Sequence, residues 1–226
     1  MAIKLRTLTA SLGMLVLVGS ITPILNAAQL PETLLVQTSV DLIRQGNEKY
    51  DKGDYQGAIE DFDQAIKIEP NNSLIYVLRG NARDDLGDSQ GAIKDYNQAL
   101  KLNSRSHLAY YNRGLAYRRR EDNQLALADY NETVRLAPRF EPVYLERGIV
   151  HDILGNQSEA LADFNQVLKF NPNAGEAYYN RANIRVRSGD KQGALEDYQK
   201  AASIYQQEGK TDYYQDAITN IRRLQE

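Results

Sequence analysis

The side chains best suited to chemistry in this 226-residue chain are aspartates, arginines, tyrosines and two histidines. A metal or acid–base centre would draw on His107 and His151, but neither has a carboxylate partner at a metal-ligand spacing. The chain has no cysteine, which excludes thiolate catalysis, and it carries no phosphate-binding loop, dinucleotide fingerprint or nucleophile elbow. We therefore expect no catalytic residue, no cofactor and no metal, and a protein that is not an enzyme.

A regular series of arginines offers a second kind of chemistry, the binding of anions. Each arginine lies roughly midway between two aspartates. Both series advance along the chain by 34 residues per copy, as from Arg79 to Arg113 and from Asp95 to Asp129. The two series are Arg79, Arg113, Arg147 and Arg181, and Asp61, Asp95, Asp129, Asp163 and Asp197. The matching periods favour a ladder of Asp–Arg pairs over an anion-binding stripe, because repeat proteins are stabilised by repeated interface contacts. The spacing leaves pairing within a unit and between units open, and we expect pairing between units.

The same step runs through small and aromatic positions, which indicates the elements that must position these charges. The series are Gly46, Gly80, Gly114, Gly148 and Ala182; Ala58, Ala92, Ala126, Ala160 and Ala194; and Phe62, Tyr96, Tyr130, Phe164 and Tyr198. In each copy we predict two helices, whose small residues allow close approach while the aromatic ring fills the space behind. The first tyrosine of copies two to five, at Tyr76, Tyr110, Tyr144 and Tyr178, is expected in the core, and Leu42 takes that place in copy one.

Turn residues mark the boundary between the two helices of a copy. Gly53, Gly87, Gly155 and Gly189 are expected to end the first helix in a left-handed conformation. The residues that follow them, Asp54, Asp88, Asn156 and Asp190, are suited to cap the second helix. The third copy departs from this pattern, because Glu121–Asp122 replaces the glycine and its neighbour.

A repeat with this period and with these small and aromatic positions resembles the tetratricopeptide repeat (TPR) family, as an exported bacterial member. The resemblance covers residues 39–206, divided into copies 39–72, 73–106, 107–140, 141–174 and 175–206. It implies an all-α, right-handed superhelical solenoid of about five helix–turn–helix units whose concave groove binds peptides or protein segments. Residues 207–226 are expected to supply a hinge and a capping helix, because a terminal repeat would otherwise expose an apolar face.

The family geometry places the groove along the first helix of each unit, opposite the buried small residue. The polar groove residues are then Asn47, Tyr50, Asp51, Asn81, Asp84, Asp85, Tyr111, Arg118, Arg119, Tyr179, Asn183 and Arg187. The same positions include Ile43, Val77, Leu115, Leu145, Ile149, Asp152, Ile153 and Val186. This distribution predicts an acidic end at copies one and two and a basic end in copies three and five. A bound peptide would then take one orientation.

The first 28 residues differ from the rest of the chain. Lys4 and Arg6 precede an apolar run, and Ala27 and Ala28 follow it, which is typical of a secretory signal peptide. Residues 29–38 read as a linker. Cleavage would remove two of the 27 basic residues and none of the 30 acidic ones, leaving 25 against 30. This mild acidity argues against nucleic-acid binding. We expect an exported protein, in the periplasm, another extracytoplasmic lumen or secreted, with no membrane span after cleavage.

These expectations converge on a non-catalytic scaffold that binds a protein or peptide of unknown identity. Two alternatives come from other classes. One is a structural solenoid that only associates with itself, and the other is an enzyme that uses groove carboxylates.

Overall fold

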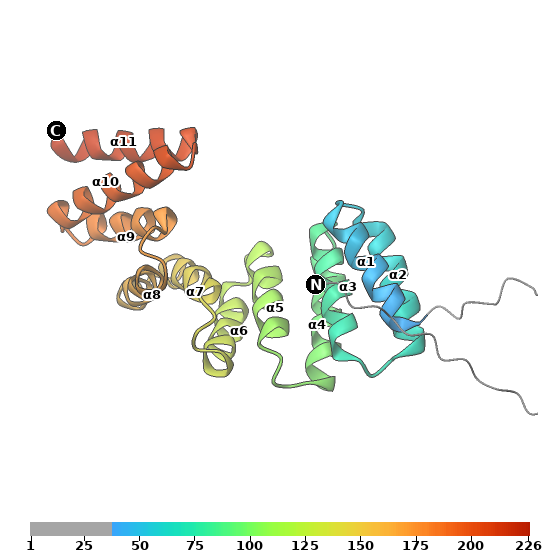
Figure 1. Ribbon diagram of the computed structural model, residues 1–226. Helices are drawn as coiled ribbons and strands as arrows, with labels where there is room; N and C mark the ends of the chain where they lie inside the picture. The colour runs from blue at the N-terminus through green and yellow to red at the C-terminus, as the bar shows by residue number, and fades with distance from the viewer. Residues whose placement is uncertain (1–37) are drawn as a thin grey trace, which may run out of the picture. The chain divides into compact units, whose positions relative to one another are not determined.

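Helix pairs make up residues 38–226, the part of the chain that the computed structural model describes. Within that range there are eleven helices and no strand, and helices adjacent in sequence pack against each other (Figure 1). Their bounds are α1 Ser39–Asp51, α2 Tyr55–Ile68, α3 Ser73–Asp85, α4 Ser89–Leu102, α5 His107–Arg119, α6 Asn123–Leu136, α7 Pro142–Ile153, α8 Gln157–Phe170, α9 Gly175–Arg187, α10 Lys191–Gln207 and α11 Thr211–Gln225. This is an all-α helical repeat. The expected signal peptide and all but the last residue of the linker lie outside the described residues.

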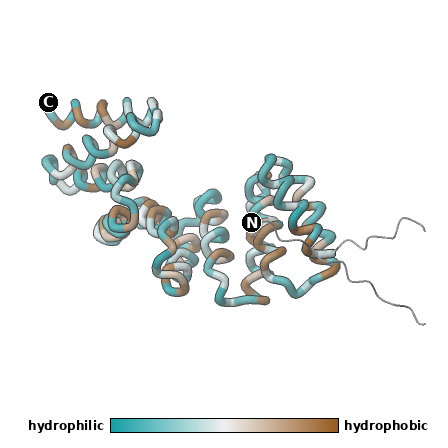
Figure 2. The backbone as a smooth tube through the Cα atoms, viewed as in Figure 1, coloured by the Kyte–Doolittle hydropathy of each residue, from teal (hydrophilic) through white to brown (hydrophobic). Residues whose placement is uncertain are grey.

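The helices group into five pairs, which we call units 1 to 5, from α1–α2 to α9–α10, followed by the single helix α11. Within a pair, the small residue of the first helix packs on the aromatic ring of the second. A Cβ atom built on Gly80 would lie 2.6 Å from Tyr96 Cε1, and the other three glycines of the series meet their rings similarly. Apolar positions recur among polar ones along the helices (Figure 2). The close helix pairing predicted from the small and aromatic series is therefore confirmed.

The first tyrosines of the copies do not lie in the core as expected. Tyr76, Tyr110 and Tyr178 are only partly buried, although Tyr144 is buried. The fully buried position is one residue earlier, at Ile75, Ala109, Val143 and Ala177. One residue corresponds to a rotation of about 100° around a helix, so the tyrosine lies at the edge of the core. There the hydroxyl of Tyr76 donates to the carbonyl of Pro70 at 2.9 Å.

The turn glycines behave as predicted, and the third unit shows how the fold tolerates their loss. Gly53, Gly87, Gly155 and Gly189 all have positive φ, between 79° and 96°. In unit 3 Glu121 takes the same left-handed conformation, with φ 63°. A side chain in this conformation clashes with the following carbonyl, which is unfavourable by about 1–2 kcal/mol.

Side-chain capping of the second helices depends on two positions, the capping residue and the residue three places after it. Asp54, Asp88 and Asp190 accept a hydrogen bond from the backbone N–H three residues later, and that residue is always glycine. A Cβ at Gly91 would lie 2.0 Å from the Asp88 carboxylate. Unit 4 has Glu159 at the equivalent place, and Asn156 makes no side-chain cap, contrary to expectation.

The C-terminal helix occupies the place of a further first helix. α10 is 17 residues long, whereas the second helices of the other units have 14. Gly209, with φ 70°, then turns the chain into α11. Ala217 of α11 is fully buried, and Ile221 and Leu224 pack against the core of unit 5. The apolar stripe of α11 therefore covers the end of the repeat, as the sequence predicted.

Candidate functional site

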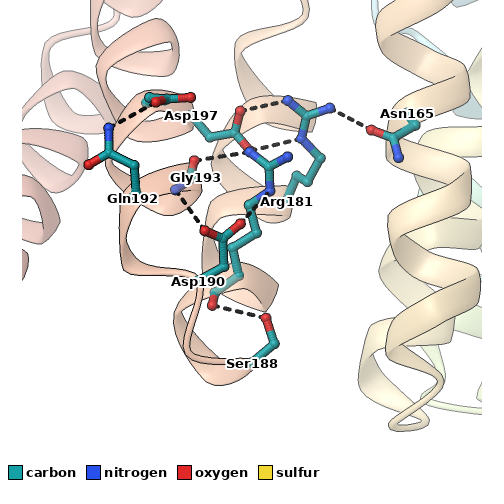
Figure 3. Close-up of polar contacts among 9 residues, drawn as sticks. Asn165, Arg181, Ser188, Asp190, Gln192, Gly193 and Asp197 are labelled. Atoms are coloured by element: carbon teal, nitrogen blue, oxygen red, sulfur yellow. Dashed lines mark hydrogen bonds and ion pairs between the residues drawn. The ribbon is translucent and has the colours of Figure 1, made fainter.

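The arginine series forms part of the framework. Arg113 donates from Nε and Nη2 to both oxygens of Asp129, at 2.7 and 2.6 Å, and Arg79, Arg147 and Arg181 repeat this pair. The aspartate belongs to the same unit, so the expected pairing between units is wrong. Arg181 also donates through Nη1 to Asn165 of the preceding unit, as Figure 3 shows. The equivalent acceptors in earlier units are Asp63, Asn97 and Asn131.

Each framework arginine is held on a further side by a tyrosine ring. The guanidinium of Arg113 lies over Tyr110, with its carbon 5.5 Å from the ring centroid, and the other three arginines lie over Tyr76, Tyr144 and Tyr178. The paired aspartates are only 4–6% exposed in their side chains. Because the bidentate pair already satisfies most of each guanidinium, this series is a ladder and offers no open stripe for anions.

The expected groove residues define what we call the first-helix face, on α1, α3, α5, α7 and α9. Its N-terminal part contains a hollow of about 210 Å³ between α1, α3 and α5, lined by Tyr50, Asn81, Asp85 and Arg119 among others. Asn47 lines a smaller hollow of about 20 Å³ beside it. Asn47 and Asp51 form no hydrogen bond or ion pair within residues 38–226, so their polar groups are available. Val77 is buried and does not belong to the open face.

The charges around this hollow pair with one another. Arg119 of α5 contacts Asp84 and lies 3.6 Å from Asp85, both on α3. Asp84 is only 7% exposed, so it supports the wall of the hollow instead of facing a ligand. The hydroxyl of Tyr50 donates to Asp85. Burial raises the pKa of Tyr50, and this hydrogen bond raises it further.

The two remaining predicted arginines are paired in the same way. Arg118 lies 2.9 Å from Glu146, and Arg187 contacts Asp152. Burial raises the pKa of Glu146, while Arg118 opposes that shift. The expected basic end is therefore wrong, because each of its three arginines contacts a carboxylate, whereas the N-terminal end keeps a net negative charge. The opposite charges meet between adjacent first helices instead of forming two separate fields.

The tyrosines and asparagines in the C-terminal part of the first-helix face pack against aromatic rings, form hydrogen bonds, or do both. Tyr111 packs edge-on against Phe140, with centroids 5.0 Å apart, and burial raises its pKa to about 12. Tyr179 packs on Tyr198 and accepts a hydrogen bond from Asn220 of α11 at 3.1 Å. The hydroxyl of Tyr198 donates to Asn183. Unit 5 of the face is thus partly covered by the capping helix.

Sequence reasoning missed several residues that shape the face. Tyr96 reaches it from α4 by donating to Asn81 at 2.9 Å, and Asn112 donates to the same oxygen at 2.8 Å. Glu146 was also missed. A signal was available for the ion pairs: Asp84 and Arg119, like Asp152 and Arg187, are opposite charges 35 residues apart. Because the repeat advances 34 residues per unit, a separation of 35 residues places the two side chains on adjacent first helices with an offset of one residue.

The histidines have local partners in the structure. His107 packs edge-on against Phe140, and His151 Nδ1 lies 3.3 Å from the side-chain nitrogen of Asn156. Burial lowers the pKa of His151. Across the described residues, no group of three His, Cys, Asp or Glu side chains is arranged to hold a metal ion. In the same range, no helix has the length and apolar character needed to cross a membrane.

Comparison with known families matches this geometry. A family model described as tetratricopeptide repeat matches residues 77–139 and 145–209, and one described as TPR repeat matches residues 46–87. The chain belongs to the tetratricopeptide repeat family. TPR proteins are helical-repeat scaffolds that typically mediate protein–protein interaction and are generally non-catalytic. No curated protein matches the chain.

Solved TPR structures resemble the chain over most of its length. A crystal structure of MamA is 25% identical, covers 73% of this chain and 96% of its own, and gives a TM-score of 0.67. YrrB, described as a TPR protein with an unusual peptide-binding site, is 21% identical over 76% of this chain and 88% of its own, at TM-score 0.64. The first TPR of Spaghetti (RPAP3), solved with the HSP90 peptide SRMEEVD, is 26% identical over 53% of this chain and 94% of its own, at TM-score 0.51.

Proposed function

We propose that this TPR protein is a non-catalytic scaffold that binds an extended peptide or protein segment along its first-helix face, outside the cytoplasm. The observation that carries the proposal is the contrast between the framework and this face. The Arg–Asp pairs recur in units 2 to 5 with nearly the same distances. The side chains on the face differ from unit to unit and leave the hollow between α1, α3 and α5.

The chemistry of this hollow suits a peptide backbone. Amide side chains such as Asn47 donate to and accept from peptide groups, and a partly buried ring such as Tyr50 gives contact area with little loss of side-chain freedom. Arg119 contacts Asp84 and Asp85, and the hydroxyl of Tyr50 donates to Asp85, so both carboxylates already have partners although the set keeps one formal negative charge. We therefore infer that the N-terminal half of the face binds mainly through backbone hydrogen bonds and packing.

The likeness to a peptide complex supports this proposal. The first TPR of Spaghetti (RPAP3) was solved with an HSP90 peptide, and it is 26% identical to the matched half of this chain. The likeness does not identify the ligand of this chain. A clamp for a terminal carboxylate would need a cation beside the asparagines of the face, and this chain has Ile43 at an equivalent place on α1.

The proposed location outside the cytoplasm rests on the sequence of residues 1–28 alone. A basic start, a short apolar run and small residues are the features of a cleaved export signal. The test is sequencing of the mature N-terminus after expression of the full chain in its own cell type. We expect cleavage after Ala27 or Ala28; an intact Met1 in cytoplasmic fractions would overturn this part of the proposal.

Peptide binding is tested by selecting short random peptides on the immobilised full chain and measuring their affinity by calorimetry. The double variant Asn47→Ala/Asp51→Ala removes two polar groups that have no partners within the described residues. A matched control in the same unit is Glu60→Ala/Gln64→Ala, which removes an exposed carboxylate and an exposed amide from α2. We expect binding about five-fold weaker in the first variant, and within about two-fold of the parent in the control.

Three results would overturn the proposal. The first is that no peptide is enriched. The second is that the control weakens binding as much as the first-helix variant does. The third is that a variant with all four residues replaced binds the selected peptides with the same affinity as the parent. If the chain instead sediments as a defined oligomer and selects no peptide, the self-associating solenoid becomes the better hypothesis.

A further inference from the structure

A second hollow lies at the C-terminal part of the repeat, between the ends of α7, α9, α10 and α11. Its volume is about 370 Å³, which is within the range of ligand pockets. Its apolar wall includes Leu145 of the first-helix face, Val167 of α8 and Tyr205 of α10. The hollow therefore continues the proposed binding surface towards α11.

The hollow is open because two large side chains are missing relative to the preceding unit. At the equivalent place between units 3 and 4, Phe140 packs edge-on against Tyr111, with centroids 5.0 Å apart. Their counterparts one repeat later are Ala174 and Leu145, and both line the hollow. The same repeat geometry is thus filled by aromatic rings at one step and left empty at the next.

The extended end of α10 supplies a ring that faces into this space. Tyr205 lies on the turn by which α10 exceeds the other second helices, and Gly175 admits it, since a Cβ there would lie 2.9 Å from Tyr205 Cε1. Tyr205 is only 4% exposed and stacks obliquely on Tyr213, at 5.4 Å between centroids. Its hydroxyl makes no hydrogen bond to any residue in the range 38–226, although it belongs to a residue that lines the hollow.

The charge at the rim of the hollow is negative. Glu141 and Glu176 line it and form no ion pair within the described part of the chain, whereas Glu208 is paired with Lys210 at 2.9 Å. The N-termini of α7 and α9 each contribute about half a positive charge, which offsets roughly half of the two glutamates. The N-terminus of α11 has its own counter-charge in Asp212. A cation is therefore the favoured occupant.

We propose that this hollow binds one long basic side chain, arginine or lysine, of a peptide lying along the first-helix face. The alkyl part would lie on Leu145 and on the exposed ring of Tyr213, which Tyr205 supports from behind. The charged end would meet Glu141 and Glu176. Tyrosine rings and carboxylates together favour such a group, because a cation is attracted to both the ring face and the carboxylate. This inference rests on the proposed function, and it fixes the register of the peptide by an anchor in units 4 and 5.

The test uses peptides selected on the full chain, each synthesised with arginine at the preferred position and again with citrulline, its neutral near-isostere. The parent is expected to bind the arginine form about five- to ten-fold more tightly. Glu141→Gln/Glu176→Gln removes the charge without changing shape, and we expect the preference to fall below about two-fold. Ala174→Phe restores the ring that fills the preceding step, and should abolish the preference while leaving weaker binding elsewhere on the face.

The outcomes separate this inference from the proposed function. Enriched peptides without a basic preference, or an undiminished preference in both variants, would overturn the basic-side-chain site while leaving peptide binding intact. Failure to enrich any peptide on the parent would overturn both. Since the glutamine variant changes only two side chains at the surface, its result does not depend on whether Ala174→Phe folds.

Discussion

Units 3 and 5 contain nearly the same hexapeptide, AYYNRG at 109–114 and AYYNRA at 177–182, yet their surroundings differ. The framework pair is the same in both: Arg113 binds Asp129 at 2.7 and 2.6 Å, and Arg181 binds Asp197 at 2.8 and 2.6 Å. The second tyrosine is not equivalent. In unit 3 Tyr111 packs on Phe140, while in unit 5 its counterpart accepts a hydrogen bond from α11.

The turns of these two units differ as well. Unit 5 has Gly189 in the left-handed conformation and a side-chain cap from Asp190, whereas unit 3 uses Glu121 and has no side-chain cap. The buried ring also differs, because Tyr198 donates to Asn183 while the hydroxyl of Tyr130 has no hydrogen-bond partner within residues 38–226. A repeated sequence motif thus sets the framework, and residues outside it decide strain, polarity and the binding face.

The largest expected effect concerns the framework aspartates. Asp129→Ala leaves Arg113 partly buried without its main partner and should lower the free energy of unfolding by about 3 kcal/mol. Asp197→Ala should lower it by about 4 kcal/mol, because Asp197 also holds Arg185 at 2.8 Å. Denaturant unfolding followed by circular dichroism measures both. Asp51→Ala, at an exposed residue, serves as the control and should stay within about 0.5 kcal/mol. Losses near the control value for both aspartates would show that the ladder contributes no stability.

The next effect comes from the turns. Glu121→Gly removes a left-handed side chain and should raise the free energy of unfolding by about 1 kcal/mol, despite the greater freedom of glycine in the unfolded chain. Gly189→Ala makes the opposite change in unit 5 and should lower it by about 1 kcal/mol. Thermal melts of the two variants are the measurement. Changes of the same sign would mean that Glu121 is not strained in its turn.

Much of the framework was predictable because it depends on a residue's own unit. The glycine turns and the packing of small residues on rings require only that each copy of the repeat forms two helices. The tyrosine prediction failed by a single position, since the buried residue is Ala109 and not Tyr110. A period gives the repeat but does not give the rotation of a helix about its own axis, and that rotation decides which neighbour is covered.

The candidate site was harder to predict because its contacts join different units. Arg119 and Asp84 were both predicted on the first-helix face, but their sequence positions do not reveal that they touch each other. The direction of the Arg–Asp pairs posed the same difficulty, because each arginine has an aspartate at a similar separation along the chain on either side. The hollow beside Tyr205 depends on two absent rings and an extra helical turn, none of which belongs to the repeated pattern.

A smaller effect tests the buried rings of units 3 and 5. Tyr198→Phe deletes a hydrogen bond and leaves Asn183 without its donor, so it should lower the free energy of unfolding by about 1 kcal/mol. Tyr130→Phe deletes a hydroxyl that is buried without a partner among the described residues, so it should be neutral or slightly stabilising. The same denaturant titration compares them. An equal loss in both would show that Tyr130 does have a partner, and the guanidinium of Arg118 lies near enough to be that partner.

The smallest expected effect extends the comparison to unit 4, which keeps the turn glycine but lacks the side-chain cap. There Asn156 meets Nδ1 of His151, and burial lowers the pKa of His151 below its usual value of 6.5. The folded protein then holds fewer protons at this site than the unfolded chain does. The stabilising contribution is therefore present above the unfolded pKa and lost as pH falls through the folded one.

Thermal melts at about pH 7.5 and about pH 5.5 measure that loss when the parent is compared with a variant that lacks His151. His151→Gln should show a smaller fall in melting temperature between the two values than the parent does. His107→Gln leaves His151 in place and should keep the parent's dependence. The carboxylates are the same in every variant, so the difference between the two glutamine variants reports on His151. If that difference is nil, burial in unit 4 does not favour the neutral form of the His151 imidazole, and the pH dependence of stability comes from other groups.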